Sequence, residues 1–428
     1  LAHTDPPLED AIELYNPTAA AVEVSGWWLS NDPDAPYKFR IPAGTTIPAG
    51  RYMVFYEQNQ LNGFSSVAGF NRSGTGVAPD FTFNSAHGDS AVLNQALANG
   101  ALTGVRVTKG FGPSANGVSF GRYVKSDGGV DYVAMAARTF GTDTPFSVTQ
   151  FRAGTGLSNS YPLVGPLIIS EVYYQPPPVI SAGVTNDNSS DEFIELTSLS
   201  SAPLALYDPV FPTNCWRLRG GIDYEFPKNT IVPANARILV VNFSPKNDQA
   251  QLASFRTKYG VPSDVALFGP YNGKLSNSGD TVQLEKPDPV QLPPHPDAGF
   301  VPFVLVDKVK YDVGNGWPTN ASGTGCSIQR INLAGYGNDQ INWSGVAPTA
   351  GRANTAAAVT LLRPTVDSSG LVFSFVSELA RTYKVEFATA LGQVTWQTLT
   401  NLTGTGTPLA VRDPGLRTSA RFYRVTAQ

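Results

Sequence analysis

A few residues in this sequence have types and spacings that could support chemistry. His87 directly precedes Gly88-Asp89, and a histidine beside an aspartate can act as a general acid-base pair. No serine or cysteine nucleophile motif surrounds it, and catalysis needs a base, a partner and a pocket together. We therefore predict that His87 is a turn residue. His3 and His295 lie in proline-rich segments, where we expect them in solvent, and three scattered histidines lack zinc-site spacing.

The carboxylates do not predict a catalytic or metal site. Glu13 and Glu195 occupy equivalent positions in two copies of a repeat described below, whereas an acid-base pair must lie within about 5–10 Å. We expect each as an outward polar residue on a half-buried strand. Asp191 and Glu192 follow the oxygen-rich segment 186–188, which could hold calcium, but the spacing is not that of an EF-hand. No catalytic residue, metal site or cofactor is predicted.

The two cysteines, Cys215 and Cys326, lie on two predicted strands of the same repeat copy. In an extracellular protein a disulfide between them would stabilise the fold by about 2–4 kcal/mol. The other copy has no cysteine at the matching positions, so the fold does not need the bond. A bonded pair and two buried free thiols both remain open, because geometry decides between them.

Six tryptophans could stack on sugar rings. Trp27 and Trp28 are adjacent in an alternating strand, so their side chains should face opposite sides. An exposed Trp28 would indicate a ligand or partner surface. Packing in the core is the favoured interpretation for the others, because buried aromatic residues dominate sandwich cores.

The composition narrows the fold class. The chain has 428 residues, a net charge of −4, 15% charged residues, 41 Gly and 34 Pro. Low charge with many turn formers indicates an all-β protein of two to four domains. The 42% of hydrophobic residues argues against disorder, and the mildly acidic balance argues against nucleic-acid partners. No run of 18 apolar residues occurs, so no membrane span is predicted.

A repeat organises the first 356 residues. Five blocks recur in the same order at a spacing of roughly 180–210 residues. The blocks are 12–14 with 194–196, 27–29 with 215–218, 37–54 with 224–240, 88–93 with 279–284 and 117–122 with 325–330. Each block is short and alternates apolar with polar residues, as strands of a β-sandwich do.

These blocks predict the domain organisation. We expect a first copy over 1–153, a linker over 154–165, a second copy over 166–356 and a small immunoglobulin- or fibronectin-like sandwich over 357–428. One short helix is predicted over 250–259, where Leu252, Phe255 and Tyr259 share a face.

The motif set resembles the lamin-tail domain of bacterial secreted and surface proteins. In the first copy the resemblance rests on the segments 10–16, 26–30, 41–50 and 116–122. In the second copy it rests on 168–172, 191–196, 317–318 and 347–354. The resemblance implies tandem Ig-like β-sandwiches, usually repeated modules of large extracellular proteins, and carries no shared catalytic residues. Nuclear relatives contact DNA and chromatin, but this sequence lacks a clustered basic surface.

The two copies open differently. The second opens with the apolar run 167–172, and the first, starting at Leu1, matches only the tail of that segment. We hypothesise that residue 1 is an internal position of a longer polypeptide or follows a cleavage. A missing strand would leave an open sheet edge, which is a template for strand addition.

The sequence thus favours a non-catalytic extracellular or cell-surface array of structural or adhesive modules, part of a larger secreted protein and an assembly subunit. Its expected partners are other proteins or further copies of itself. The alternative is a carbohydrate- or cell-wall-binding accessory region of an upstream enzyme, which would need an aromatic platform or a calcium site.

Overall fold

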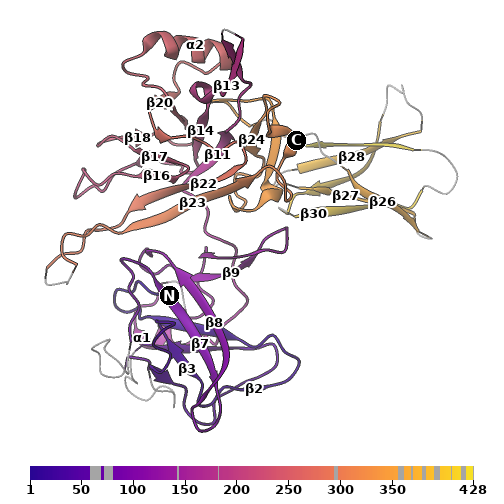
Figure 1. Cartoon of the computed structure of the whole chain (residues 1–428). Helices are drawn as coiled ribbons and strands as arrows, with labels where there is room; N and C mark the ends of the chain where they lie inside the picture. Colours follow the sequence, from indigo (N-terminus) through magenta and orange to yellow (C-terminus); the bar gives the residue numbers. More distant parts are fainter. Residues whose placement is uncertain are drawn as a thin grey trace.

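The computed structural model describes residues 1–57, 69–71, 81–141, 144–181, 183–293, 297–354, 361–367, 370–377, 382–389, 396–405, 407–415 and 421–427. The chain is all-β, with Ig-like β-sandwich architecture, and its sheets gather into three groups along the sequence (Figure 1). No helix in the described part of the chain is long and apolar enough to cross a membrane.

The described residues of the first copy form ten strands and one short helix. They are β1 (Ala11–Tyr15), β2 (Val22–Glu23), β3 (Trp28–Ser30), β4 (Phe39–Arg40), β5 (Thr46–Ile47), β6 (Tyr52–Tyr56), β7 (Asp89–Ala96), β8 (Leu102–Phe111), β9 (Phe120–Val124), β10 (Val130–Ala134) and α1 (Val148–Phe151). One sheet has four strands in the order β4-β3-β7-β8. The others, β1-β6, β9-β10 and β2-β5, have two strands each. Alternation buries one side of the four-stranded sheet against residues such as Phe55 and Phe81.

The segment expected to link the copies lies against the first copy. Met135 and Pro162 form an isolated β-bridge, and Leu163 donates its amide hydrogen to the Ala134 carbonyl at 2.8 Å. Leu157 donates its amide hydrogen to Glu13 Oε1 at 3.2 Å. Residues 157–163 therefore belong to the first copy, and the second copy starts at Pro166.

The second copy is the larger unit. Its elements are β11 (Leu167–Tyr173), β12 (Val179–Ser181), β13 (Val184–Asn186), η1 (Ser189–Asp191), β14 (Phe193–Ser198), β15 (Leu204–Ala205), β16 (Arg217–Gly220), β17 (Ile222–Glu225), β18 (Ile231–Val232), β19 (Arg237–Val241), α2 (Gln249–Tyr259), β20 (Ala266–Phe268), β21 (Asn272–Gly273), β22 (Gly279–Pro287), β23 (Phe303–Asp312), η2 (Thr319–Ala321), β24 (Ser327–Arg330), η3 (Gln340–Asn342) and β25 (Trp343–Val346).

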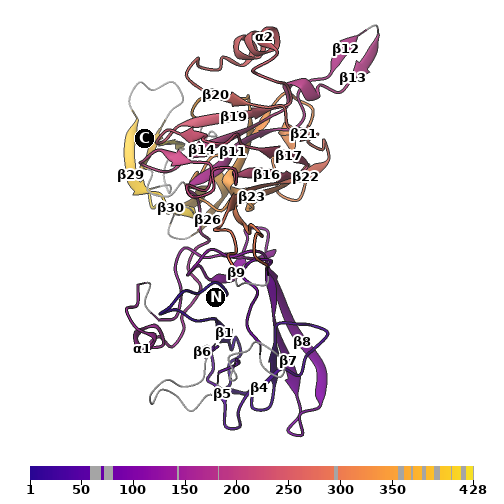
Figure 2. The same cartoon turned by 90° about the vertical axis from the view of Figure 1, so that its left-hand side faces the viewer.

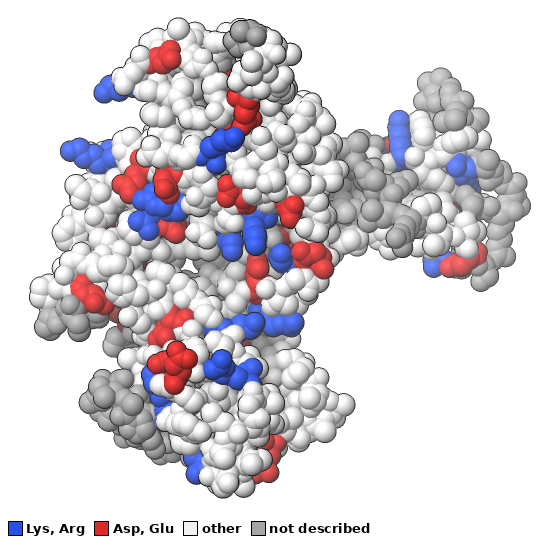
Figure 3. Space-filling model, in the orientation of Figure 1, with Lys and Arg blue, Asp and Glu red and all other residues white. Residues whose placement is uncertain are grey.

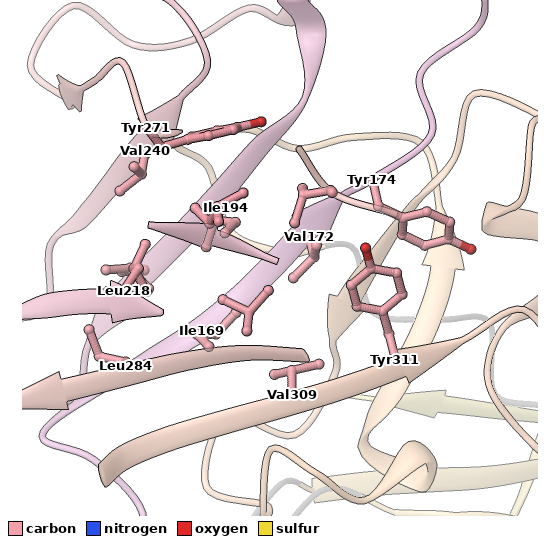
Figure 4. Packing of buried hydrophobic residues seen from close by; sticks show 14 of the residues in the cluster. Ile169, Val172, Tyr174, Ile194, Leu218, Val240, Tyr271, Leu284, Val309 and Tyr311 are labelled. Atoms are coloured by element: carbon pink, nitrogen blue, oxygen red, sulfur yellow. The ribbon is translucent and has the colours of Figure 1, made fainter. Parts of the chain in front are cut away.

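Two sheets face each other in this copy. One has six strands in the order β20-β19-β14-β11-β24-β25, and the other has five in the order β21-β17-β16-β22-β23. Figure 4 shows Ile169, Val172 and Ile194 from the first sheet packed toward Leu284 and Val309 from the second. The apolar run at the start of this copy thus becomes β11, a central strand whose residues are all buried.

The predicted helix is confirmed as α2. Asp248 caps its start by accepting the Gln251 amide hydrogen at 2.9 Å, and Gly260 ends it with φ +63°. Phe255 and Tyr259 pack on the outer face of the six-stranded sheet, against Phe193 and other residues. That face, left open in many sandwiches, is therefore covered.

The C-terminal group consists of two three-stranded antiparallel sheets. Its strands are β26 (Leu361–Asp367), β27 (Gly370–Val376), β28 (Thr382–Ala388), β29 (Gln397–Thr403), β30 (Pro408–Asp413) and β31 (Phe422–Ala427). The orders are β26-β27-β30 and β29-β28-β31, and Phe373, Phe375 and Tyr383 form the core between them. In Figures 1 and 2 this group extends to one side of the second copy, away from the first.

Candidate functional site

His87 contacts the second copy. Its Nε2 lies 3.1 Å from Asp297 Oδ2, and its ring stacks on Phe300 with centroids 4.0 Å apart. Asp297 and Phe300 belong to the connection between β22 and β23. His87 therefore contributes a polar and a ring contact between the two modules.

His3 is half-buried at the same boundary, which corrects the expectation that it lies in solvent. Its Nδ1 lies 2.7 Å from the Ser114 carbonyl oxygen and 3.4 Å from Asp288 Oδ2. Asp288 directly follows β22, so both described histidines of the chain contact the β22–β23 hairpin of the second copy. His295 lies outside the described residues.

Tyrosines and aspartates form the centre of this boundary. The Tyr123 hydroxyl donates to Asp339 Oδ2 at 3.1 Å, and the Tyr336 hydroxyl donates to Asp131 Oδ2 at 2.9 Å. The Tyr161 hydroxyl in turn accepts the Tyr336 amide hydrogen at 2.8 Å. The Tyr123 ring lies edge-on to the other two tyrosine rings. Burial raises the pKa of Tyr123 and of Tyr336, so both remain neutral donors at physiological pH.

These contacts cross between the copies in both directions. Asp131 of the first copy also accepts from Asn338 Nδ2 at 2.7 Å, and Asp339 of the second also accepts from the Ser126 amide and hydroxyl. Figure 2 shows β9 at the end of the first copy that faces the second. We call the set formed by Tyr123, Ser126, Asp131, Tyr161, Tyr336, Asn338 and Asp339 the inter-copy interface.

The second copy holds two buried carboxylates side by side. Glu171 on β11 and Glu195 on β14 are directly opposed in register, and neither is exposed to solvent. Glu195 does lie on the outer face of β14, but it is buried there, so the expectation of a half-buried strand is wrong. The strand was expected to be half-buried, but its outer face is covered as well. Glu171 could not be found by pattern, because it stands within an apolar run.

Hydrogen bonds from the end of the second copy hold this pair. Glu171 accepts the amide hydrogen and the hydroxyl of Thr349, each at 3.0 Å. Glu195 accepts the Gly351 amide hydrogen at 2.8 Å and the Ser170 hydroxyl at 2.6 Å. The carboxylates thus fasten the segment 349–351 to the sheet. We call Glu171 and Glu195 the carboxylate pair.

The electrostatics of the carboxylate pair favour a bound proton. Burial and then the charge of Glu195 raise the pKa of Glu171 to about 8. Burial also raises the pKa of Glu195, against the opposing effect of the Ser170 hydroxyl and the nearby Arg237. A shared proton between two carboxyls is also found in catalytic sites, but here both groups are enclosed and no substrate can reach them.

Glu13 of the first copy matches Glu195 but stands alone. It is half-buried and accepts from the Thr139 hydroxyl at 2.7 Å as well as from Leu157. Burial raises its pKa. Glu13 thus holds the closing segment of the first copy, as Glu195 holds that of the second.

A buried ion pair joins the two sheets of the second copy. Arg330 Nη1 lies 2.6 Å from Asp307 Oδ2, and Arg330 is fully buried. The same nitrogen donates to the Ile169 carbonyl at 3.2 Å, and Asp307 accepts the Ile169 amide hydrogen at 2.8 Å. The pair therefore satisfies backbone groups of β11 that would otherwise be buried without partners.

The oxygen-rich segment considered for calcium is paired with lysines. Asp191 accepts from Lys258 and from Asn188 Nδ2, and Asp187 accepts from Lys274. Glu192 is buried and accepts the Tyr271 hydroxyl at 2.9 Å. No group of three or more His, Cys, Asp or Glu residues in the described ranges is placed to hold a metal ion.

Both cysteines are free thiols in the structure, and each is half-buried. Cys215 precedes β16 of the five-stranded sheet, and its Sγ donates to the Pro212 carbonyl at 3.4 Å. Cys326 precedes β24 of the six-stranded sheet. The two thiols precede strands of opposite sheets and Cys215 turns toward its own loop, and a disulfide between them stays a prediction.

Trp28 is half-buried on the side of β3 away from the core, whereas Trp27 packs against the core. The Trp28 ring meets the exposed Tyr37 edge-on at 5.3 Å, and its Nε1 donates to the Gly100 carbonyl at 3.2 Å. The Arg40 guanidinium lies 5.9 Å from its centroid. This is a small aromatic surface rather than a flat, open platform.

The charged residues visible in Figure 3 are interspersed in sign across that face of the molecule, with no large basic area on it. The histidines and interface aspartates described above contact the neighbouring copy, and Glu13, Glu171 and Glu195 bind the closing segment of their own copy.

Three comparisons place the chain among known proteins, and only the family model bears on its fold. A search of curated proteins gave no match. One solved structure found is a DUF4876 family protein from Bacteroides thetaiotaomicron, at 10% identity and a TM-score of 0.29, covering 79% of this chain and 95% of that one. Residues 2–109, within the first copy, match the family model of the Lamin Tail Domain.

Proposed function

We propose that this chain is a non-catalytic array of structural and adhesive modules, extracellular or on the cell surface, within a larger secreted protein that assembles with other proteins. Its modules are 1–153, the connecting segment 154–165, 166–356 and the C-terminal sandwich 357–428. Titratable side chains such as Asp131, Asp339 and His87 lie at the contact between the copies, which supports a role in holding the modules together.

The inter-copy interface is the observation that carries this proposal. Tandem modules on a free linker need no contacts, yet Tyr336, Asp131 and Asp339 exchange hydrogen bonds across the two copies. Partly buried hydrogen bonds of this kind, made by several side chains together, fix the relative position of two domains. A fixed spacing between modules is what a structural or adhesive array requires.

Measuring whether the protein lies on the surface of the cells that produce it tests the proposal. Antibody labelling of intact cells, with protease shaving followed by mass spectrometry, should detect this chain outside the membrane. Detection only after cell lysis would overturn the extracellular role.

The alternative, binding to carbohydrate or cell wall, is favoured by one feature, the Trp28–Tyr37 aromatic pair. A polysaccharide pull-down with the native chain and with Trp28→Ala separates the two proposals. The array proposal expects no saturable retention. Retention that Trp28→Ala abolishes would establish the accessory role instead. Val210→Ala, at a side chain 76% exposed in the second copy, is the matched control.

A further inference from the structure

The chain leaves the second copy through a segment that lies on that copy. This closing segment, residues 347–354, follows β25, contains no strand and lies beside α2 over the outer face of the six-stranded sheet. Ala350 in its middle is fully buried in the cluster that contains Phe193 and Phe255. Because the chain then continues to β26, the closing segment is the first part of the tether of the C-terminal sandwich.

Side chains rather than a strand ladder hold the closing segment on the sheet. The one backbone–backbone hydrogen bond that its residues form within the described part of the chain is a local turn, from the Arg352 amide to the Thr349 carbonyl at 2.9 Å. Three donors, the amides of Thr349 and Gly351 and the Thr349 hydroxyl, bind the carboxylate pair. Asn354 donates to backbone carbonyls of β11 and β24. The attachment thus depends largely on two carboxyl groups.

One cation among the described residues faces the carboxylate pair. Arg237 on β19 lies 3.5 Å from Glu195 Oε1, whereas Glu171 forms no ion pair with a described residue. Arg352 of the closing segment donates instead to the carbonyls of Tyr259 and Thr349. The other groups around the pair are neutral polar side chains on β11, β14 and β24: Ser170, Tyr173, Thr197, Ser327 and Gln329. Two ionised carboxylates would therefore face a single positive charge.

Contact with water links the closing segment to the protonation of the pair. With the segment attached, burial and then the charge of Glu195 raise the pKa of Glu171 to about 8, against an ordinary value of 4.5. Detachment brings the pair into water, where a carboxyl ionises more readily than a buried one. Between these pH values the attached state holds a proton that the detached state releases. Rising pH therefore favours detachment.

We propose that the closing segment is a pH-controlled attachment: it lies on the sheet while the carboxylate pair holds a proton, and it detaches when both carboxyls are ionised. Detachment adds residues 347–354 to the tether of the C-terminal sandwich, which is up to about 27 Å of extended chain. The inference goes beyond the proposed function, because it makes the position of the third module variable while the contact between the first two stays fixed.

Hydrogen exchange of the full chain tests the proposal. The amides of Thr349 and Gly351 should exchange through detachment, so their protection should be lower than that of the β14 amides. Between pH 4.5 and 8 their protection, taken relative to the intrinsic exchange rate at each pH, should fall by up to about tenfold per pH unit. The β14 amides report unfolding of the whole sheet, which separates detachment from a loss of global stability.

Two variants at buried carboxyls of the same copy give a matched comparison. Glu171→Gln keeps a hydrogen-bonding group that cannot ionise, so the protection of Thr349 and Gly351 should vary by less than about threefold across the same pH range. Glu192→Gln removes a carboxyl that binds Tyr271 and not the closing segment, and it should leave the pH dependence unchanged. If Glu171→Gln fails to fold, exchange in the unmodified chain still decides.

A distance measurement tests the consequence for the third module. Spin labels at Ser254→Cys on α2 and Asn401→Cys on β29, both exposed, are introduced after Cys215→Ser and Cys326→Ser. The distances between the two labels should be longer and more broadly distributed at pH 8 than at pH 4.5.

The proposal fails if the closing segment and β14 are equally protected, if the protection of the closing segment does not change with pH, or if the distances between the labels are the same at both pH values. None of these results affects cell-surface location, which tests the proposed function separately.

Discussion

At the scale of single residues, the carboxylates with raised pKa values and structural roles are the buried ones. Glu13 and Glu195 were recognised as equivalent from the sequence, but the pattern of one strand does not show what covers it. In the structure the closing segment lies over this face of the sheet, where Gly351 donates to Glu195 and Thr349 donates to Glu171. The partner Glu171 arises from strand order, which a single sequence does not reveal.

The carboxylate pair predicts how stability depends on pH. The pKa of Glu171 in the folded protein, about 8, lies above its ordinary value of 4.5, so the folded state binds more protons than the unfolded state between these values. The free energy of unfolding should therefore fall as pH rises through this window, by up to about 1.4 kcal/mol per pH unit.

Urea unfolding at several pH values between 4.5 and 8 measures this slope. Glu171→Gln should reduce the dependence of the free energy of unfolding on pH. A smaller dependence should remain, because burial also raises the pKa of Glu192 to about 7. Asp127→Asn is the control, since that carboxyl is exposed and its pKa is lowered. An unchanged slope in Glu171→Gln would contradict the account.

The buried ion pair should be costly to break from one side. Arg330→Met leaves Asp307 buried without its partner, so we expect a loss of about 3–5 kcal/mol in the free energy of unfolding. The double variant Arg330→Met/Asp307→Leu should recover much of it. Arg412→Met, in the half-exposed pair with Asp367, should cost under about 1 kcal/mol. Chemical denaturation measures all three, and equal losses in the two single variants would exclude the role assigned to Arg330.

At the scale of elements, the sequence pattern of a short segment predicts a helix or strand correctly where that element depends on contacts between nearby residues. Spacing of Leu252, Phe255 and Tyr259 predicted α2, and the apolar run 167–172 indicated a strand, which the structure buries as β11. Placement of the segment 157–163 against the first copy was missed, because glycine, serine and asparagine fit a linker and a closing segment equally well.

Removing the contact between α2 and the sheet tests the packing of that element. Phe255 is 1% exposed and contacts Phe193, Phe243 and Tyr259, so Phe255→Ala should lower the free energy of unfolding by about 3–5 kcal/mol. Thr257→Ala, on the exposed side of the same helix, should change it by under about 1 kcal/mol. Thermal and urea unfolding provide the comparison. A small effect of Phe255→Ala would show that α2 is not part of the cooperative unit.

At the scale of the whole molecule, the sequence predicted the repeat and the all-β class but not how the copies meet. Nothing in the local pattern links His87 to Asp297 or Tyr336 to Asp131, which are about two hundred residues apart along the chain. Contacts between modules depend on surface shape and polar complementarity, and these exist only once each module has folded.

A fixed relation between the two copies is the central claim, and one distance measurement tests it most directly. Spin labels at Glu23→Cys and Ser254→Cys, both exposed, are introduced after Cys215→Ser and Cys326→Ser. Pulsed electron paramagnetic resonance should give one narrow distribution of distances between the two spin labels. The double variant Asp131→Ala/Asp339→Ala should broaden that distribution. A broad distribution with the interface intact, equal to that of the double variant, would contradict the account.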